Sequence, residues 1–409
     1  MVYIVIFYFF IGLFVNHRKT VAQICLLSPL IYNMGSVMGY SASFLLSILC
    51  LFSFAIKEHV LIRIKHIYFI IPVLVMFISL WISNQYGGHP HPSVLLQVII
   101  SYAPFVIFAS YSSDGSESYL DYCLHLLYVV TCIIIFVSIA ETVSRTNPLY
   151  DFLQKIELYD STRLKTIEDV RFGLKRSQSL FSMHTSLGGY MYCVFAMFGI
   201  LWNRYGLCLK RAILFLSFAC IVIFLTGARS AIVSLLVCSI FFINKDFVHR
   251  IGIGRISVTI IALFVMSSYF LIGADSILNS NDASGSTTDM REMQFDIASF
   301  YWLQSPIYGN GINYTWEVVL PDNKELLGAE SVWIPYMIDQ GFIGCIAWFL
   351  FSIYAGIYCI RFGMKEYLYP IIGWVILNTL SSIPGVDNTF FLSCFLIALR
   401  YKQLKTIEL

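Results

Sequence analysis

The sequence predicts an all-α polytopic integral membrane protein with about 12–13 transmembrane helices. Hydrophobic residues make up 58% of the 409 residues and charged residues only 12%, with a mean hydropathy of +0.76. Soluble domains are typically about 45–50% apolar. Apolar blocks recur at lengths near the roughly 20 residues that a helix needs to cross a bilayer. We therefore expect a single transmembrane domain over residues 1–409.

The expected spans follow one another along the chain. Residues 1–15 carry no basic n-region and no small-residue cleavage site, so they predict a retained span. Residues 21–56 predict either one long helix or a tight hairpin, because Pro29, Asn33 and Gly35 interrupt the apolar run. The remaining spans are expected at 67–82, 93–111, 119–140, 181–202, 212–225, 230–243, 257–271, 332–360, 368–380 and 389–399.

Short basic clusters beside these spans predict the orientation in the membrane. When the spans are threaded, the clusters fall on one side, which is the cytoplasm together with the C-terminus. Arg18 and Lys19 join them only if residues 21–56 form a hairpin, which favours thirteen spans. The opposite side receives a first loop at 141–179 and a large loop at 274–330. The clusters are Lys57/Arg63/Lys65, Arg204/Lys210/Arg211, Lys245/Arg250/Arg255, Arg361/Lys365 and Arg400/Lys402/Lys405.

Charge and cysteine usage exclude other classes. The net charge of +2 and the absence of a basic stripe give no reason to expect nucleic-acid binding. Nearly all of the eleven cysteines lie inside apolar spans, and no C-x-x-C pair occurs. We therefore expect no disulfide framework, no metal site and no cofactor.

The large loop is the one place where many polar residues leave the membrane, so we expect the active site there. Asp289 and Glu292 are spaced as in a capping box, and apolar residues then recur at helical spacing until Pro306. The pattern predicts a helix of about four turns with Arg291 in its first turn. A cation is disfavoured there by the helix dipole unless an anion is bound. Pairing with Glu292 or Asp296 is the alternative explanation of Arg291.

Arg229 presents the same oddity on the same face. Thr226 or Gly227 is a plausible N-cap for the following span, which places Arg229 in a first turn at the membrane boundary. Two arginines at helix N-termini would make a strong oxyanion or phosphate site. Arg176 is a further contributor to such a site, or a lipid headgroup contact. His184 touches substrate or is a satisfied interfacial histidine.

Other polar and aromatic residues have structural explanations beside functional ones. Tyr308 and Tyr314 suit an interfacial aromatic belt, although aromatic faces also stack on sugar rings. Asp339 lies inside an apolar stretch and is expensive in lipid, so it must face protein or water. A structural hydrogen-bonding partner is enough to explain it.

The ordered set of motifs in the second half of the chain resembles the O-antigen polymerase and O-antigen ligase superfamily. The motifs are Thr-Gly-Ala-Arg-Ser at 226–230, Arg291 early in a helix, Pro306 followed by Gly309 and Gly311, Ala-Glu-Ser at 329–331 and Gly-Phe-Ile-Gly at 341–344. The resemblance implies a metal-independent membrane glycosyltransferase of the bacterial inner membrane, active on the periplasmic face. Its donor is a sugar chain on undecaprenyl pyrophosphate. A polysaccharide chain-length regulator is an expected partner.

The resemblance also implies roles for residues. Arg229 and Arg291 match arginine positions of the family, and both are assigned to the pyrophosphate. Tyr308, Gly309, Gly311 and Tyr314, with Arg176 and His184, are the expected substrate-binding residues.

One departure from the family pattern is informative. Where the ligase-like pattern has a histidine, this chain has Glu330. That carboxylate could accept the proton of the acceptor hydroxyl, orient the acceptor sugar, or only hold an arginine in place. The missing histidine favours an O-antigen polymerase over a ligase. A capsule or exopolysaccharide polymerase of the same superfamily stays open, as does, from another class, a lipid-linked oligosaccharide flippase.

Overall fold

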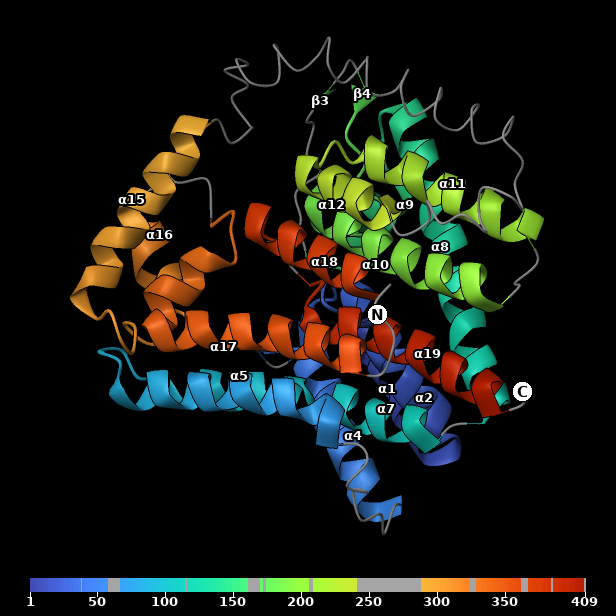
Figure 1. The fold of residues 1–409 in the computed structure, drawn as a ribbon, viewed down its shortest axis with the longest axis horizontal. Helices are drawn as coiled ribbons and strands as arrows, with labels where there is room; N and C mark the ends of the chain where they lie inside the picture. The colour runs from blue at the N-terminus through green and yellow to red at the C-terminus, as the bar shows by residue number, and fades with distance from the viewer. Residues whose placement is uncertain are drawn as a thin grey trace.

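The computed structural model describes residues 1–37, 39–57, 67–114, 116–160, 170–171, 174–205, 209–240, 288–323, 329–361, 367–383 and 385–407. These residues are mostly helical, and the strands among them are two short antiparallel hairpins. The helices pack into one bundle, with α15 (Thr288–Gln304) standing at one edge (Figure 1). This confirms the expected all-α membrane fold. The expected span at 257–271 and the basic cluster at 245–255 lie outside the described residues.

The N-terminal region folds as a hairpin of helices. Two short helices return across the bundle, a pair of short antiparallel strands follows, and a longer helix crosses again, because Pro29 and the glycines interrupt the apolar run. The Lys57 ammonium donates a hydrogen bond to the carbonyl of Phe14, so both ends of the hairpin meet near Arg18. The elements are α1 (Val2–Val15), α2 (His17–Leu26), α3 (Ser28–Ile31), β1 (Ser36–Val37), β2 (Tyr40–Ser41) and α4 (Ala42–Lys57).

The next part of the chain departs from the expected spans in two places. The span at 93–111 has a local break at Tyr102, because Pro104 has no N–H with which to continue the helical hydrogen bonds across it. The helix expected to end at 140 continues to Ser144, so Glu141 is helical and buried rather than in the loop. The elements are α5 (Ile67–Tyr86), α6 (Pro92–Ser101), α7 (Ala103–Asp114), α8 (Glu117–Ser144), α9 (Pro148–Lys155), β3 (Val170–Arg171) and β4 (Leu174–Lys175).

The C-terminal half contains the candidate site. The helix expected over 332–360 is interrupted at Gly341, whose φ of 63° and ψ of −154° are not helical. The elements are α10 (His184–Tyr205), α11 (Leu209–Leu225), α12 (Arg229–Ile240), α15, the π-helix η2 (Thr315–Val319), α16 (Leu320–Asp322), α17 (Trp333–Arg361), α18 (Leu368–Leu380) and α19 (Asn388–Ile407).

Three helical stretches among the described residues are long and apolar enough to cross a membrane by length and composition alone. They are Pro92–Ser112, Glu117–Ser144 and Trp333–Arg361. The other described candidates are shorter apolar helices.

Contacts sort the loops into two ends of the bundle. At one end the Tyr119 hydroxyl donates to the carbonyl of Arg18, and the Tyr401 hydroxyl donates to Asp121. At the other end the loop after α8 meets the turn after α3, where the N–H of Gly35 donates to the carbonyl of Leu158. We call this second end the polar end, since the candidate site described next lies there.

Candidate functional site

The last turn of α18 organises the polar end. The backbone N–H of Val332 donates to the carbonyl of Asn378 at 3.0 Å, and the Trp333 indole donates to Thr379 Oγ1 at 3.2 Å. These bonds dock the Ala329–Glu330–Ser331 segment onto the end of the helix. The first bond also satisfies the carbonyl of Asn378, one of the late carbonyls of α18 that have no partner within the helix.

Arg291 reaches the same helix end from α15. Its Nη2 donates to the carbonyl of Leu380 at 3.2 Å, and its Nε lies 3.7 Å from Glu330 Oε2. Arg291 lies in the first turn of α15, as expected, although the helix begins at Thr288, so Asp289 is inside it rather than its cap. The negative end of the α18 dipole and the Glu330 carboxylate together explain how a cation is tolerated there. Arg291 does pair with a carboxylate, but that carboxylate is Glu330 from another segment of the chain.

Arg229 lies beside this cluster. It is the first residue of α12, after a tight turn in which Gly227 has a φ of 59°. Thr226 Oγ1 accepts the N–H of Ala228 at 3.2 Å, as a turn-capping hydroxyl does. The next residue, Ser230, places its hydroxyl oxygen 2.5 Å from that of Ser381, one residue after α18. The 226–230 turn and Arg291 therefore contact adjacent residues at the end of α18, Ser381 and Leu380.

Arg176 contacts the 226–230 turn from another segment of the chain. It is only 5% exposed, and its Nε donates to the carbonyl of Thr226 at 2.8 Å, while the N–H of Ser177 donates to the carbonyl of Leu225 at 3.0 Å. A buried guanidinium on the turn before Arg229 adds positive charge close to it.

Glu141 anchors the segment that carries Arg176. Its Oε2 accepts the Ser177 hydroxyl at 2.9 Å and the N–H groups of Gln178 and Ser179 at 3.1 and 2.7 Å. Its Oε1 lies 3.4 Å from the ammonium of Lys175, and both side chains are almost fully buried. One carboxylate therefore holds four of the five residues from 175 to 179, and Arg176 is the fifth.

His184 is the first residue of α10. One turn later, Gly188 packs so closely on the turn after α11 that an added Cβ would meet Ala231 Cβ at 2.9 Å and Thr226 Oγ1 at 3.5 Å. Residues four apart share a helix face, so His184 faces the same region. The N-termini of α10, α12 and α15 thus gather around the C-terminal end of α18.

This arrangement is suited to an anion. Three helix N-termini carry partial positive charge, and Arg176, Arg229 and Arg291 add guanidinium groups. Arginine forks match phosphate oxygens in two places at once. Glu330 is the carboxylate beside them, half-exposed and in contact with Arg291. The structure therefore brings together Arg176, Arg229, Arg291 and Glu330, with His184 on an adjoining helix end.

The glycines at 309 and 311 belong to a different assembly, at the other end of α15. The chain from Pro306 to Thr315 packs against α17 where that helix is interrupted at Gly341. The N–H of Gly311 donates to the carbonyl of Asp339 at 3.0 Å, and the N–H of Phe342 donates to the carbonyl of Pro306 at 2.8 Å. A Cβ on Gly309 would lie 2.3 Å from the Asp339 carbonyl carbon. Backbone packing therefore accounts for both glycines.

Asp339 has the structural partners that the sequence required. Its Oδ1 accepts the N–H and the hydroxyl of Thr315 at 2.7 and 2.5 Å, and its Oδ2 accepts the N–H of Asn313 at 3.1 Å. These bonds satisfy a carboxylate that is only 7% exposed.

Tyr308 and Tyr314 lie in the same assembly as the two glycines. Tyr308 is exposed and its ring lies 5.3 Å from that of Tyr86, whereas Tyr314 packs edge-on against His89. Arg291 and Gln304 are separated by thirteen residues of helix, or about 20 Å along its axis. The structure therefore does not bring the two tyrosines together with the arginines.

Two parts of the site were not anticipated from the sequence. The end of α18 was expected only as a membrane span, although the polar run Asn378–Thr379 before Ser381 and Ser382 was a usable signal. Glu141 was expected in a loop, and its role depends on contacts 36 to 38 residues away. All ten cysteines among the described residues are free thiols.

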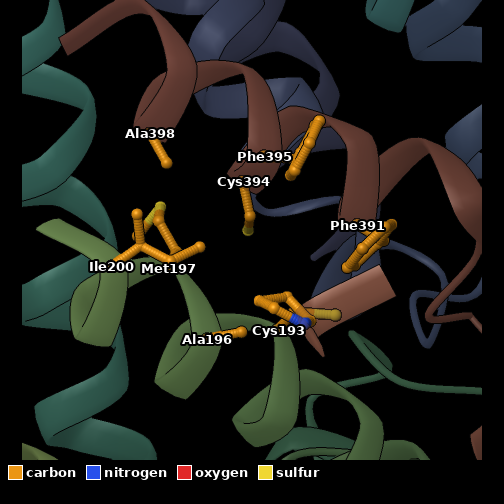
Figure 2. Close-up of a pocket in the computed structure, with 9 residues that line it drawn as sticks. Cys193, Ala196, Met197, Ile200, Phe391, Cys394, Phe395 and Ala398 are labelled. Atoms are coloured by element: carbon orange, nitrogen blue, oxygen red, sulfur yellow. The ribbon is translucent and has the colours of Figure 1, made fainter. Parts of the chain in front are cut away.

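A small cavity lies between α10 and α19 and is apolar throughout (Figure 2). The side chains of Met197, Cys394 and Phe391 border it in the close-up. Its lining holds no charged group, so it cannot stabilise a pyrophosphate. The lining residues are Cys193, Ala196, Met197, Ile200, Pro370, Phe391, Cys394, Phe395 and Ala398.

The fold and site define a polytopic membrane protein with a cluster of arginines at one end of its bundle. Residues 212–349 match the family model described as O-antigen ligase, roughly one third of the chain. The match confirms the resemblance to the O-antigen polymerase and ligase superfamily. Members of this family are glycosyltransferase-like enzymes that act on lipid-linked polysaccharide. The match does not distinguish polymerase from ligase, and no curated protein matches the chain significantly.

The matched region contains Arg229, Arg291 and Glu330, together with the 308–314 segment. Arg176, His184 and the end of α18 lie outside it. Their link to the site comes from the tertiary contacts described above.

Proposed function

We propose that this protein is an O-antigen polymerase that joins oligosaccharide repeat units carried on undecaprenyl pyrophosphate. In this proposal it lies in the bacterial inner membrane with the polar end in the periplasm, where a chain-length regulator is a partner. The observation that carries the proposal is the convergence of Arg176, Arg229 and Arg291 with Glu330 around the end of α18.

The reaction needs stabilisation of a leaving group. A hydroxyl oxygen of the acceptor sugar attacks the anomeric carbon of the donor, and the bond from that carbon to the pyrophosphate oxygen breaks. The bonding electrons leave with the pyrophosphate, and the acceptor proton passes to a base. Guanidinium groups and helix N-termini aimed at the developing negative charge lower this barrier. Arg229 and Arg291 are assigned to that charge, and Arg176 supports the turn that presents Arg229.

Glu330 supplies the carboxylate of this centre. It can accept the hydroxyl proton, or it can hold Arg291 in place at 3.7 Å. A glutamate at a position where the ligase-like pattern has histidine favours the polymerase over the ligase. A capsule or exopolysaccharide polymerase would use the same centre on another polymer.

The flippase alternative requires charged residues along a path through the spans. Asp339 was the residue that suggested one, and its carboxylate is taken up by Thr315 and Asn313. Its hydrogen bonds therefore weaken that alternative.

The first test is a gel of lipopolysaccharide from a strain lacking this protein, complemented with wild type, with Arg291→Ala or with Arg145→Asn. Arg145 is an exposed arginine at the end of α8 with a φ of 57°, which asparagine tolerates, so it is a matched loss of one positive charge. We expect the deletion and Arg291→Ala to leave core carrying one repeat unit, and Arg145→Asn to restore the ladder.

Two results would redirect the proposal. Bare core with polymer still built on the lipid carrier identifies the ligase. A full ladder in the deletion strain, with loss of a capsule or exopolysaccharide instead, identifies a polymerase of that other product.

A further inference from the structure

A cluster of two histidines and a glutamate lies at the end of α5, apart from the arginine centre. His89 and His91 flank Pro90 in the loop between α5 and α6, with ring centres 4.3 Å apart. The N–H of His91 donates to Asn84 Oδ1 at 2.7 Å, which fixes the loop to the last turn of α5. The backbone of Gly311 packs against this loop so closely that a Cβ added to Gly311 would lie 2.1 Å from the carbonyl oxygen of His89.

Glu317 reaches this loop from η2. Its Oε2 lies 3.4 Å from His89 Nε2 and 3.0 Å from His91 Nε2. Its other oxygen, Oε1, accepts the side-chain amide of Asn313 at 2.7 Å. The three ligand atoms lie within 4.8 Å of one another.

His91 Nε2 points to a missing partner. The atom is buried, on a side chain that is 28% exposed, and it makes no hydrogen bond although Glu317 Oε2 lies 3.0 Å away. A buried polar atom without a hydrogen bond is costly unless something else satisfies it. An imidazole nitrogen that lies beside a carboxylate oxygen and a second imidazole can act as a metal ligand.

The distances agree with those of a metal site. A tetrahedral zinc ion with bonds of about 2.0–2.1 Å separates its ligand atoms by roughly 3.3 Å. The distances from Glu317 Oε2 to His91 Nε2 and to His89 Nε2, 3.0 and 3.4 Å, lie on either side of this value. Imidazole and carboxylate together select zinc and its first-row neighbours over magnesium or calcium. The Asn313 hydrogen bond orients the carboxylate, as partners of metal ligands commonly do.

We propose that His89, His91 and Glu317 bind a divalent transition-metal ion, with zinc as the best match to the ligand set. The ion links the α5–α6 loop to η2, which directly follows the segment that packs against the interruption of α17. The cluster lies at the far end of α15 from Arg291, so the ion has a structural role and takes no part in glycosyl transfer. This proposal departs from the expectation of no metal site, which rested on cysteine spacing.

The test uses the full-length protein in detergent, purified without a polyhistidine tag and stripped with a chelator. Binding of Zn²⁺ is measured by calorimetry and by competition with a chromogenic chelator, and bound Co²⁺ by its visible absorption. We expect one ion per chain in the wild type and a rise in melting temperature on adding Zn²⁺. The His89→Ala/His91→Ala variant should lose both effects.

Two further variants make the test decisive. Glu317→Gln is nearly isosteric and should weaken Zn²⁺ binding at least tenfold while the protein still elutes as a single species. His125→Ala removes an exposed histidine of α8 and should bind as the wild type does. No binding by the wild type at micromolar Zn²⁺, or equal binding by the double variant, would overturn the proposal.

Discussion

At the scale of single residues, Arg291 and Glu330 form a pair whose members come from different elements. Arg291 also donates to the end of α18, so its guanidinium is held between a carboxylate and a helix carbonyl. A pyrophosphate entering this centre would compete with Glu330 for the same donors. The pair is thus able to keep the guanidinium oriented until the substrate arrives.

The function of this pair can be tested by a double-mutant cycle. Arg291→Ala is expected to lower polymerisation by about 10²–10³-fold, the usual effect of losing one donor to developing negative charge. Arg291→Lys should recover part of the activity, since it keeps the charge but not the fork. Polymerisation is measured with purified lipid-linked repeat units.

If Glu330 acts through Arg291, the double variant Arg291→Ala/Glu330→Gln should be no slower than Arg291→Ala alone. Additive losses would contradict this and give Glu330 an independent role as the base.

At the scale of elements, the segment 175–179 depends on α8. The one carboxylate of Glu141 holds four of its five residues, and Ser179 is kept at a φ of 50°. Non-glycine residues at positive φ are strained and persist only when their surroundings fix them. The α8 terminus therefore positions Arg176 on the turn before Arg229.

Glu141→Gln should loosen this segment. The amide leaves the Lys175 ammonium buried without a counter-charge, and breaking such a pair costs about 3–5 kcal/mol. We expect a lower apparent melting temperature and faster hydrogen exchange at 175–179. Glu141→Gln combined with Lys175→Met should recover much of the stability, and a double variant as unstable as the single one would refute the ion-pair explanation.

The interruption of α17 depends on glycines of the neighbouring segment. Gly309→Ala would place a Cβ 2.3 Å from the Asp339 backbone at a φ of +74°. Overpacking alone costs about 1–3 kcal/mol. We expect a clearly lower melting temperature in detergent, whereas Gly88→Ala, whose added Cβ has no atom closer than 4.0 Å, should match the wild type. Equal melting of both variants would show that the segment can move away.

At the scale of the whole molecule, the contacts place the termini of successive helices at alternating ends. Lys57 and Arg18 share one end, and the arginine centre lies at the other. The hairpin in residues 21–56 brings Arg18 and Lys19 to the end that holds Lys57, as the thirteen-span prediction requires.

This arrangement predicts a labelling pattern in intact cells. Thr146→Cys and Asp322→Cys, both exposed at the polar end, should react with a membrane-impermeant thiol reagent. Lys57→Cys should react only after the inner membrane is opened. Labelling of Lys57→Cys from outside would reverse the proposed orientation, and labelling of the unmodified protein serves as the control for its native thiols.

The sequence by itself determined the membrane class, nearly all the spans that can be compared and the placement of Arg229 and Arg291 in first turns. These properties follow from hydropathy, helical periodicity and local stop signals, which act within a few residues. It also indicated the superfamily, through short motifs in a fixed order.

Only the tertiary structure decided which residues meet. Arg291 contacts a carbonyl 89 residues away, and His89 approaches a carboxylate 228 residues away. The end of α18 is contacted by three segments, through Val332, Ser230 and Arg291, and the backbone of Asp339 passes too close to Gly309 for a side chain there. Such contacts depend on how helices pack side by side, and packing leaves no local pattern in the chain.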